Sequence, residues 1–286
     1  MSSTVKALAK NSLPRPLWKL LRLARVWSST HLFPERIVKH TYGGFPLSVW
    51  LADPLAQGWY DHEWPELAEI ALLRRGRLKT GARVFDLGAH QCVVAMMMAR
   101  IVGESGQVIA LEANRHNAEI GERNRELNGI TQLKVIAAAA AKEPGSIDFS
   151  RGLNGSVDSG NADWGKTRVR AHSIDELARL YGAPDVIFID VEGFECEVLK
   201  GARETLLLEP DAFIEVHAGC GLERFGGTRE SIFDTFSREQ YDLFAAPEKS
   251  GQFSAVTNSQ MLPSHRFFFV ALCKRQADSE SAAPQP

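Results

Sequence analysis

Four side chains that can do acid–base chemistry follow two apolar runs in the second half of the chain. Asp190 and Glu192 come at the end of the first run, and Glu215 and His217 end the second. A histidine with an ordinary pKa can take the proton of a hydroxyl, and a carboxylate can hold or assist it. We therefore predict that Asp190, Glu192 and His217 are catalytic, with His217 as the general base. The alternative is structural: the acids cap the next helix, and the histidine bonds to a backbone carbonyl.

These four residues could also bind a metal ion, because carboxylate oxygens suit Mg²⁺. A bound cation lowers the pKa of a coordinated oxygen and so helps a hydroxyl group to react. Nothing in the spacing demands a metal. We predict a site without one and keep the cation as the alternative.

A second set of residues, nearer the N-terminus, could bind a nucleoside. Residues 84–92 read VFDLGAHQC, with the single glycine Gly88 where a pyrophosphate-binding loop needs GxGxxG. Asp86 in this loop can face the ammonium group of an amino acid. Glu112 ends the next apolar run, where a carboxylate can accept hydrogen bonds from both hydroxyls of a ribose. This set favours S-adenosylmethionine over NAD. The alternative is that the two acids only cap helices.

Alternating strands and helices are predicted to position both sets. The predicted strands cover residues 83–86, 107–112, 133–138, 146–149, 168–171, 185–190, 212–216, 242–245 and 266–273, and the predicted helices cover 66–77, 91–102, 115–127, 174–180, 195–207 and 229–238. This alternation indicates βαβ units and a mostly parallel sheet covered on both faces, so the fold class is α/β. Ligands of such sheets bind beyond the carboxyl ends of the strands, where both sets of residues lie.

The composition is that of an ordinary globular protein, with 44% hydrophobic and 24% charged residues among 286. No apolar run approaches the roughly 18 residues that suggest a membrane span, and charged residues interrupt any secretory signal near the N-terminus. The four cysteines are scattered and show no metal-binding spacing. We predict a cytoplasmic protein with reduced thiols.

The charge of the chain is unevenly distributed. Residues 1–40 hold eight Lys and Arg and one acid, a charge of +7, whereas the rest holds 25 basic and 34 acidic residues. An acidic body argues against nucleic acid as a partner. Residues 14–27 predict a basic amphipathic helix, which could contact the inner membrane surface peripherally or dock on the domain or on a second subunit. We divide the chain into a basic arm (1–57), a catalytic domain (58–274) and a disordered tail (275–286).

Several of these runs resemble a known family. They are VFDLGAHQC (84–92), VIALEANRHNAEIGERNRELNG (108–129), FIDVEGFECEVLKGARETL (188–206) and IEVH (214–217). They resemble the FkbM family of S-adenosylmethionine-dependent methyltransferases, and the resemblance covers about residues 58–217. It implies the class I methyltransferase (Rossmann-like) fold, a doubly wound, mostly parallel seven-stranded sheet with one antiparallel strand. It also implies O-methylation of a sugar, glycolipid or natural-product hydroxyl, on a small-molecule or a glycan- or lipid-linked acceptor.

The resemblance also assigns the cofactor residues. The loop on the methionine side contains Asp86, Gly88, Ala89 and His90. The acid that binds the ribose is Glu112, and the residues that border the adenine are Ala138 and Ala139. The chain departs from the family pattern at Cys92, where a glycine is usual, and at Ala141 and Lys142, where a Gly-Asp pair is usual. These departures motivate one alternative to the methyltransferase, a non-catalytic S-adenosylmethionine-binding module that kept the fold. A second alternative is a NAD-dependent oxidoreductase, against which the missing GxGxxG argues.

Overall fold

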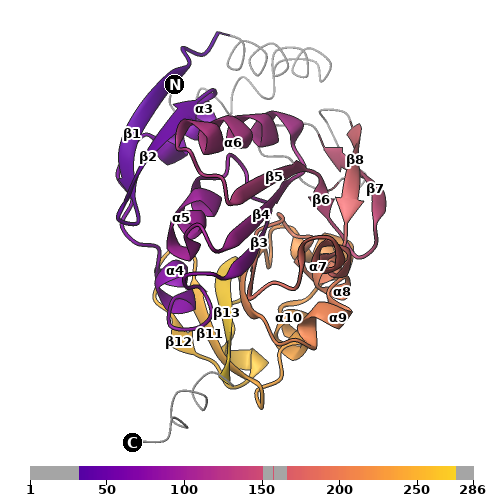
Figure 1. The fold of residues 1–286 in the computed structure, drawn as a ribbon. Coiled ribbons are helices and arrows are strands. Elements are labelled where there is room, and N and C mark those ends of the chain that lie inside the picture. Colours follow the sequence, from indigo (N-terminus) through magenta and orange to yellow (C-terminus); the bar gives the residue numbers. More distant parts are fainter. Residues whose placement is uncertain (1–31, 151–156, 158–165, 275–286) are drawn as a thin grey trace, which may run out of the picture.

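The computed structural model describes residues 32–150, 157 and 166–274, and its central element is an eight-stranded sheet (Figure 1). The strand order is β12-β11-β13-β10-β9-β3-β4-β5. The strands are β3 (Arg83–Leu87), β4 (Gln107–Glu112), β5 (Leu133–Ala137), β9 (Val186–Ile189), β10 (Asp211–Val216), β11 (Tyr241–Pro247), β12 (Ser254–Ala255) and β13 (Phe267–Cys273).

The direction of the strands confirms the predicted fold class. Strands β5, β4, β3, β9 and β10 are mutually parallel, and β13 enters antiparallel between β10 and β11. The seven strands from β11 to β5 are thus the predicted mostly parallel sheet with one antiparallel member. The two-residue strand β12 was not predicted, and it extends the sheet by pairing antiparallel with β11.

Helices cover both faces of this sheet and enclose two apolar cores. The α-helices after the N-terminal region are α4 (Ala68–Leu73), α5 (Val93–Val102), α6 (Arg115–Leu127), α7 (Ile174–Tyr181), α8 (Glu195–Lys200), α9 (Arg203–Leu206) and α10 (Arg229–Thr235). Successive side chains of a strand point to opposite faces. Val84 of β3 accordingly joins the core under α4 and α5, whereas Phe85 joins the core under α7 and α8. Two short 3₁₀ helices complete the described chain. One covers Leu222–Phe225, after β10, and the other covers Ser259–Met261, after β12.

Two predicted elements differ from the structure. The helix predicted over 195–207 is divided into α8 and α9 at Gly201, where a side chain would lie 2.6 Å from the Ala141 carbonyl oxygen. The strands predicted over 146–149 and 168–171 do not extend the central sheet. They are β7 (Gly145–Ser150) and β8 (Lys166–His172), which form a separate three-stranded sheet with β6 (Ala139–Ala140).

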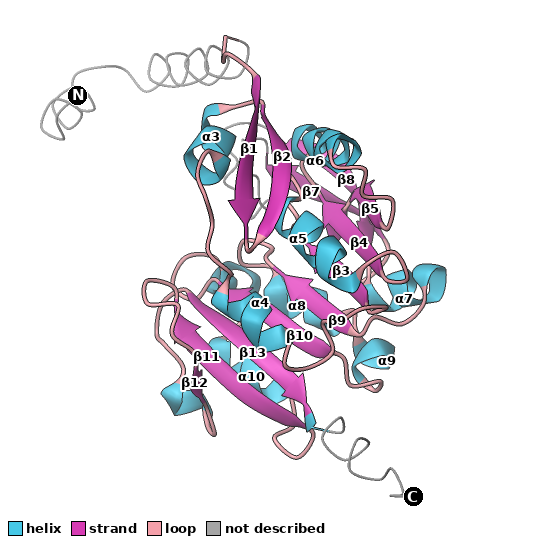
Figure 2. Cartoon of the chain, turned by 60° about the vertical axis from the view of Figure 1, so that its left-hand side comes forward, coloured by secondary structure: helices cyan, strands magenta, loops and turns pink. Residues whose placement is uncertain are grey.

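An N-terminal hairpin packs beside α6 and was missed by the sequence analysis (Figure 2). It consists of β1 (Arg36–Tyr42) and β2 (Phe45–Leu51), and α3 (Pro54–Tyr60) follows it. Asn124 of α6 and Asn128, the residue that ends this helix, replace a third strand along β2. Asn128 bonds both the amide and the carbonyl of Ser48, and Asn124 accepts from the Trp50 amide. The hairpin (36–51) is therefore folded against the domain, within the segment that the sequence analysis assigned to a basic arm (1–57).

The other terminal predictions fall on residues that the structure does not describe. The amphipathic helix predicted at 14–27 and the tail predicted at 275–286 both lie outside the described ranges. Within those ranges, no helix has the length and apolar character needed to cross a membrane.

Candidate active site

A cavity that is partly open to solvent lies at the carboxyl ends of the parallel strands. This is the edge at which α/β sheets bind their ligands. Its walls come from α3, from the loops after β3, β4, β5 and β9, and from the segment before β13. The lining residues are Trp59, Gly88, His90, Leu111, Glu112, Ala113, Ala138, Ala139, Ala140, Phe149, Val157, Asp190, Val191, Glu192 and Arg266.

The loops after β3 and β9 meet at Gly88. Its φ is +96°, and a β-carbon there would lie 1.7 Å from the backbone carbonyl oxygen of Asp190. Both the backbone conformation and the contact exclude other residues, because a side chain would collide with a fixed peptide group. Gly88 therefore brings the two halves of the predicted site together.

Glu112 presents a buried carboxylate to the cavity. The residue is 7% exposed, and its two oxygens accept hydrogen bonds from the backbone amides of His90 (2.8 Å) and Asn114 (2.7 Å). Burial raises the pKa of Glu112 to about 7, although these two amides act in the opposite direction. Glu112 thus titrates near neutral pH, and its carboxylate is poised to accept hydrogen bonds from a bound ligand.

Aromatic side chains from α3 hold the loop after β3. The Tyr60 hydroxyl and Nδ1 of His90 share a hydrogen bond of 2.8 Å. The centres of the Trp59 and His90 rings lie 4.8 Å apart. Burial lowers the pKa of His90 to about 4, so its ring is neutral at physiological pH. The sequence analysis did not single out Trp59 and Tyr60, although both lie at the start of the predicted catalytic domain (58–274).

Not every predicted cofactor residue lies at the cavity wall. Gly88, His90, Glu112, Ala138 and Ala139 line it. Two others, Asp86 and Ala89, are buried and are not among the lining residues. Burial, and then the charge of Glu112, raises the pKa of Asp86 to about 7. One carboxylate oxygen of Asp86 has no hydrogen-bond partner among the described residues.

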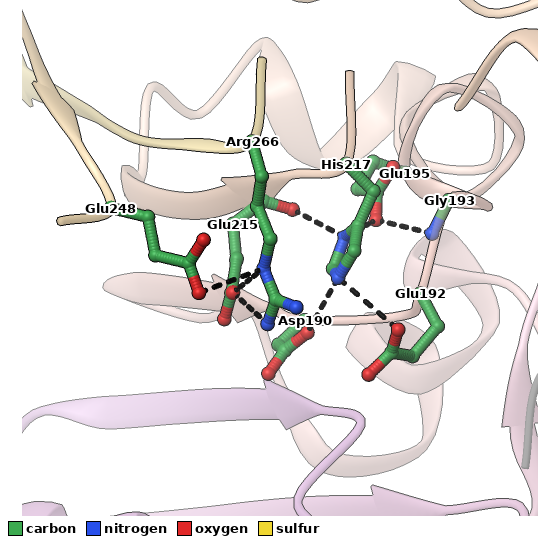
Figure 3. A network of polar contacts seen from close by, with 8 residues as sticks. All are labelled: Asp190, Glu192, Gly193, Glu195, Glu215, His217, Glu248 and Arg266. Carbon is green, nitrogen blue, oxygen red and sulfur yellow. Dashed lines mark hydrogen bonds and ion pairs between the residues drawn. The ribbon is translucent and has the colours of Figure 1, made fainter. Parts of the chain in front are cut away.

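The three predicted catalytic residues converge after β9 and β10 (Figure 3). Asp190 and Glu192 line the cavity, whereas His217 is 1% exposed and does not reach its wall. Nε2 of His217 lies 3.3 Å from a Glu192 oxygen and 3.8 Å from an Asp190 oxygen. Its Nδ1 is 2.7 Å from Oε1 of Glu195, a fully buried carboxylate that the sequence analysis did not single out.

These carboxylates change the acid–base properties of His217. Burial alone would lower its pKa, but hydrogen bonds to Glu192 and Glu195 and the charge of Asp190 raise it to about 11. This pKa lies far above the ordinary value of a histidine that acts as a general base near neutral pH. Burial, followed by the charge of Glu215, raises the pKa of Asp190 well above its usual value. The pKa values of both His217 and Asp190 are thus raised, so this cluster holds protons tightly, and the side chains of Asp190 and Glu192 face the cavity.

Arg266 is a further residue that the sequence analysis missed. It lies just before β13, lines the cavity and forms ion pairs with Glu215 and Glu248 (Figure 3). The order of elements in the sequence does not predict this position. Arg266 reaches the site because β13 is antiparallel, so the amino end of β13 lies at the edge where the parallel strands have their carboxyl ends.

The departure from the family pattern at Cys92 is accommodated by the packing. Cys92 is fully buried at the start of α5, with a φ of +63°, and Gly121 of α6 faces it. A β-carbon at Gly121 would lie 2.5 Å from the Cys92 sulfur. Space for the larger residue thus comes from the opposing helix. Lys142 forms an ion pair of 3.5 Å with Glu143 and does not line the cavity.

Comparison with protein families gives one match, to the profile described as the methyltransferase FkbM domain, over residues 86–234. Curated proteins give no significant match. A solved structure similar to the chain is the methyltransferase FkbM from Methylobacillus flagellatus, with 16% identity and a TM-score of 0.44. The alignment covers 66% of this chain and 43% of that one, so the chain spans less than half the length of that protein.

Two other solved structures show similar values. The S-adenosylmethionine-dependent O-methyltransferase from Thermotoga maritima has 13% identity and a TM-score of 0.43, over 84% of this chain and 78% of that one. Fibrillarin from Aeropyrum pernix, crystallised with natively bound S-adenosyl-L-methionine, has 13% identity and a TM-score of 0.44, over 85% of this chain and 84% of that one.

Proposed function

Because this chain belongs to the FkbM methyltransferase family, we propose that it methylates a hydroxyl of a sugar, glycolipid or natural-product acceptor. S-adenosylmethionine is its methyl donor. The observation that carries the proposal is one cavity lined both by the nucleoside-type residues Gly88 and Glu112 and by the carboxylates of Asp190 and Glu192.

The cavity residues fit S-adenosylmethionine. Glu112 supplies a buried carboxylate, which accepts hydrogen bonds only and so matches the two donors of a ribose diol. The absence of a side chain at Gly88 keeps the loop close to Asp190, beside the donor region. Ala138 and Ala139 are small, and they leave the apolar side of the cavity open to a flat base.

The donor supplies a methyl group on a sulfonium centre, so the acceptor oxygen forms its bond to carbon as the carbon–sulfur bond breaks and sulfur keeps the electron pair. The protein must hold the acceptor in line and take its proton. We assign proton acceptance to the cavity-facing carboxylates of Asp190 and Glu192. His217 acts as a positioning residue, because it contacts both carboxylates but is shielded from the cavity.

Labelled methyl transfer to native extracts tests this function. The purified chain is incubated with extract and isotopically labelled S-adenosylmethionine, and mass spectrometry then identifies the labelled products. We expect label in a hydroxyl-bearing sugar, glycolipid or related metabolite. Binding of S-adenosylhomocysteine without any labelled product would support the non-catalytic module. Calorimetric binding of NAD in place of S-adenosylhomocysteine would support the oxidoreductase.

Removing the Glu112 carboxylate is expected to weaken cofactor binding. Hydrogen bonds to a charged group contribute about 1.5–3 kcal/mol, so Glu112→Ala should raise the Kd of S-adenosylhomocysteine about 10- to 150-fold. Calorimetry measures the change. Glu112→Gln keeps the size and one acceptor and should lose less, and Glu119→Ala on the exposed face of α6 is the matched control. An unchanged Kd in Glu112→Ala, with the fold intact, would remove Glu112 from the ribose site.

The affinity for S-adenosylhomocysteine is expected to rise between about pH 6 and pH 8. The pKa of Glu112 in the free chain is about 7, and a ribose diol donates hydrogen bonds to the ionised form. Below pH 7, Glu112 must therefore release a proton when the ligand binds. The Kd of S-adenosylhomocysteine then increases by up to about tenfold for each pH unit by which the pH falls. Calorimetry in buffers of different ionisation enthalpy measures this proton release. Most of the pH dependence should disappear in Glu112→Gln, and a flat profile in the unmodified chain would contradict the assignment.

A further inference from the structure

Three side chains beside the cavity have the geometry of a metal-binding set. Asp190, Glu192 and His217 each offer one ligand-type atom, and these atoms lie within 4.8 Å of one another. The distances from Nε2 of His217 to the two carboxylate oxygens are 3.3 Å and 3.8 Å. Ligands about 2.1 Å from an octahedral ion lie about 3.0 Å apart on neighbouring positions and about 4.2 Å apart on opposite ones. Both distances from Nε2 fall within this range, so His217 could share one ion with each of the two carboxylates.

The histidine of this set is oriented as metal-bound histidines are. Its Nδ1 is held by Glu195, so Nε2 is fixed toward Asp190 and Glu192 (Figure 3). A second carboxylate that orients a coordinating imidazole in this way is a regular feature of metal sites. Nε2 is buried and, beyond its ion-pair contacts with Glu192 (3.3 Å) and Asp190 (3.8 Å), has no hydrogen bond among the described residues. Oδ1 of Asp190 likewise has no hydrogen bond among them. Both atoms are thus directed at one point, where a bound cation would replace the proton of the imidazole.

The charges around this point favour a cation. The network in Figure 3 contains five carboxylates and two side chains that can carry positive charge, His217 and Arg266. Arg266 is already engaged by Glu215 and Glu248 on the side away from Glu192. The carboxylates of Asp190, Glu192 and Glu195 therefore exceed the positive charge next to them, and a divalent ion would balance the excess.

We propose that Asp190, Glu192 and His217 bind a divalent cation of the Mn²⁺ or Mg²⁺ class at the wall of the cavity. Two carboxylates with one imidazole suit Mn²⁺ in particular, because it accepts both oxygen and nitrogen ligands. Three protein ligands leave positions of an octahedral ion open toward the cavity. As an extension of the proposed function, these positions would take oxygens of the acceptor, so the substrate class is a polyol or sugar that can chelate with neighbouring hydroxyls.

Titration of the whole chain with Mn²⁺ tests the site. After treatment with a chelator and its removal, the electron paramagnetic resonance signal of free Mn²⁺ reports binding directly, without any activity measurement. We expect one saturable site. Glu192→Gln should raise the Kd of Mn²⁺ at least about tenfold, and Glu195→Gln about 10- to 100-fold through the orientation of His217. Glu119→Gln, whose carboxyl is 63% exposed on α6, is the matched control and should bind Mn²⁺ normally.

The controls separate this inference from folding and from the proposed function. Thermal unfolding without metal must show that Glu192→Gln still unfolds cooperatively, with at most a modest fall in the midpoint, because Glu192 contacts the His217 imidazole. Saturable binding that Glu192→Gln and Glu195→Gln leave unchanged would overturn the site, as would the absence of saturable binding. If the chain binds S-adenosylhomocysteine but not Mn²⁺, the cation is refuted and the methyltransferase proposal stands. If the chain binds Mn²⁺ but not S-adenosylhomocysteine, the cation site stands and the methyltransferase proposal is refuted.

Discussion

Asp190→Asn is expected to lower kcat for methyl transfer by about 10²- to 10⁴-fold, the usual contribution of a general base. The Asp190 carboxylate lines the cavity, and burial and the charge of Glu215 raise its pKa, which makes it a better proton acceptor than an ordinary surface carboxylate. Asparagine has the same size but cannot accept a proton. Initial rates with labelled S-adenosylmethionine and the identified acceptor measure the loss.

Cofactor affinity distinguishes this effect from general damage. Gly88 contacts the backbone carbonyl of Asp190 and not its side chain, so the Kd of S-adenosylhomocysteine should stay the same in Asp190→Asn. Asp242→Asn, on the exposed surface of β11, is the matched control and should keep its kcat. A normal kcat in Asp190→Asn together with a reduced one in Glu192→Gln would assign the base to Glu192. Normal rates in both would remove the two carboxylates from the chemistry.

Gly88→Ala is expected to abolish binding of S-adenosylhomocysteine and to destabilise the fold by several kcal/mol. The new methyl group would lie 1.7 Å from the Asp190 carbonyl oxygen, and the backbone at this position has a φ of +96°. Overpacking costs about 1–3 kcal/mol, and a disfavoured backbone conformation costs a similar amount. The ends of β3 and β9 would have to separate, and the cavity lies between their loops. Calorimetry and chemical unfolding measure the two losses.

Gly44→Ala is the control that isolates the close contact. Gly44, in the turn between β1 and β2, has a φ of +88°, but no described atom lies within 4 Å of a β-carbon placed there. This variant therefore bears the cost of the backbone conformation without the collision. We expect it to lose less stability than Gly88→Ala and to bind S-adenosylhomocysteine normally. Equal losses in the two variants, with normal binding in both, would mean that the loops after β3 and β9 need not touch.

Elements with a strong local pattern could be predicted from the sequence. The bounds of β4 and α6 agree with the prediction, because an apolar run and the stop signal Asn128-Gly129 mark them clearly. The hairpin at 36–51 was missed because these residues were interpreted as part of the basic N-terminal arm, whose Lys and Arg residues lie mostly before it. Its buried residues, such as Val49, face a core supplied by distant parts of the chain. The local sequence pattern therefore cannot show that these residues are buried.

The candidate site divides in the same way. The rule that ligands bind at the carboxyl ends of parallel strands was enough to bring Gly88, Glu112, Asp190 and Glu192 to one cavity. The acid–base state of His217 could not be predicted, because it depends on Glu195, which only the fold places at 2.7 Å. Arg266 comes from the antiparallel strand, whose direction no helix–strand alternation reveals.

The asparagines of α6 have a consequence for self-association. A strand at the margin of a sheet offers unpaired peptide groups to any other extended chain, and this is a common start of aggregation. Asn124 and Asn128 bond the outward peptide groups of β2 at Ser48 and Trp50 with their side chains. A helix thus closes the margin where another strand would otherwise be needed. On this side the sheet can end at β2 without offering a template to a second molecule.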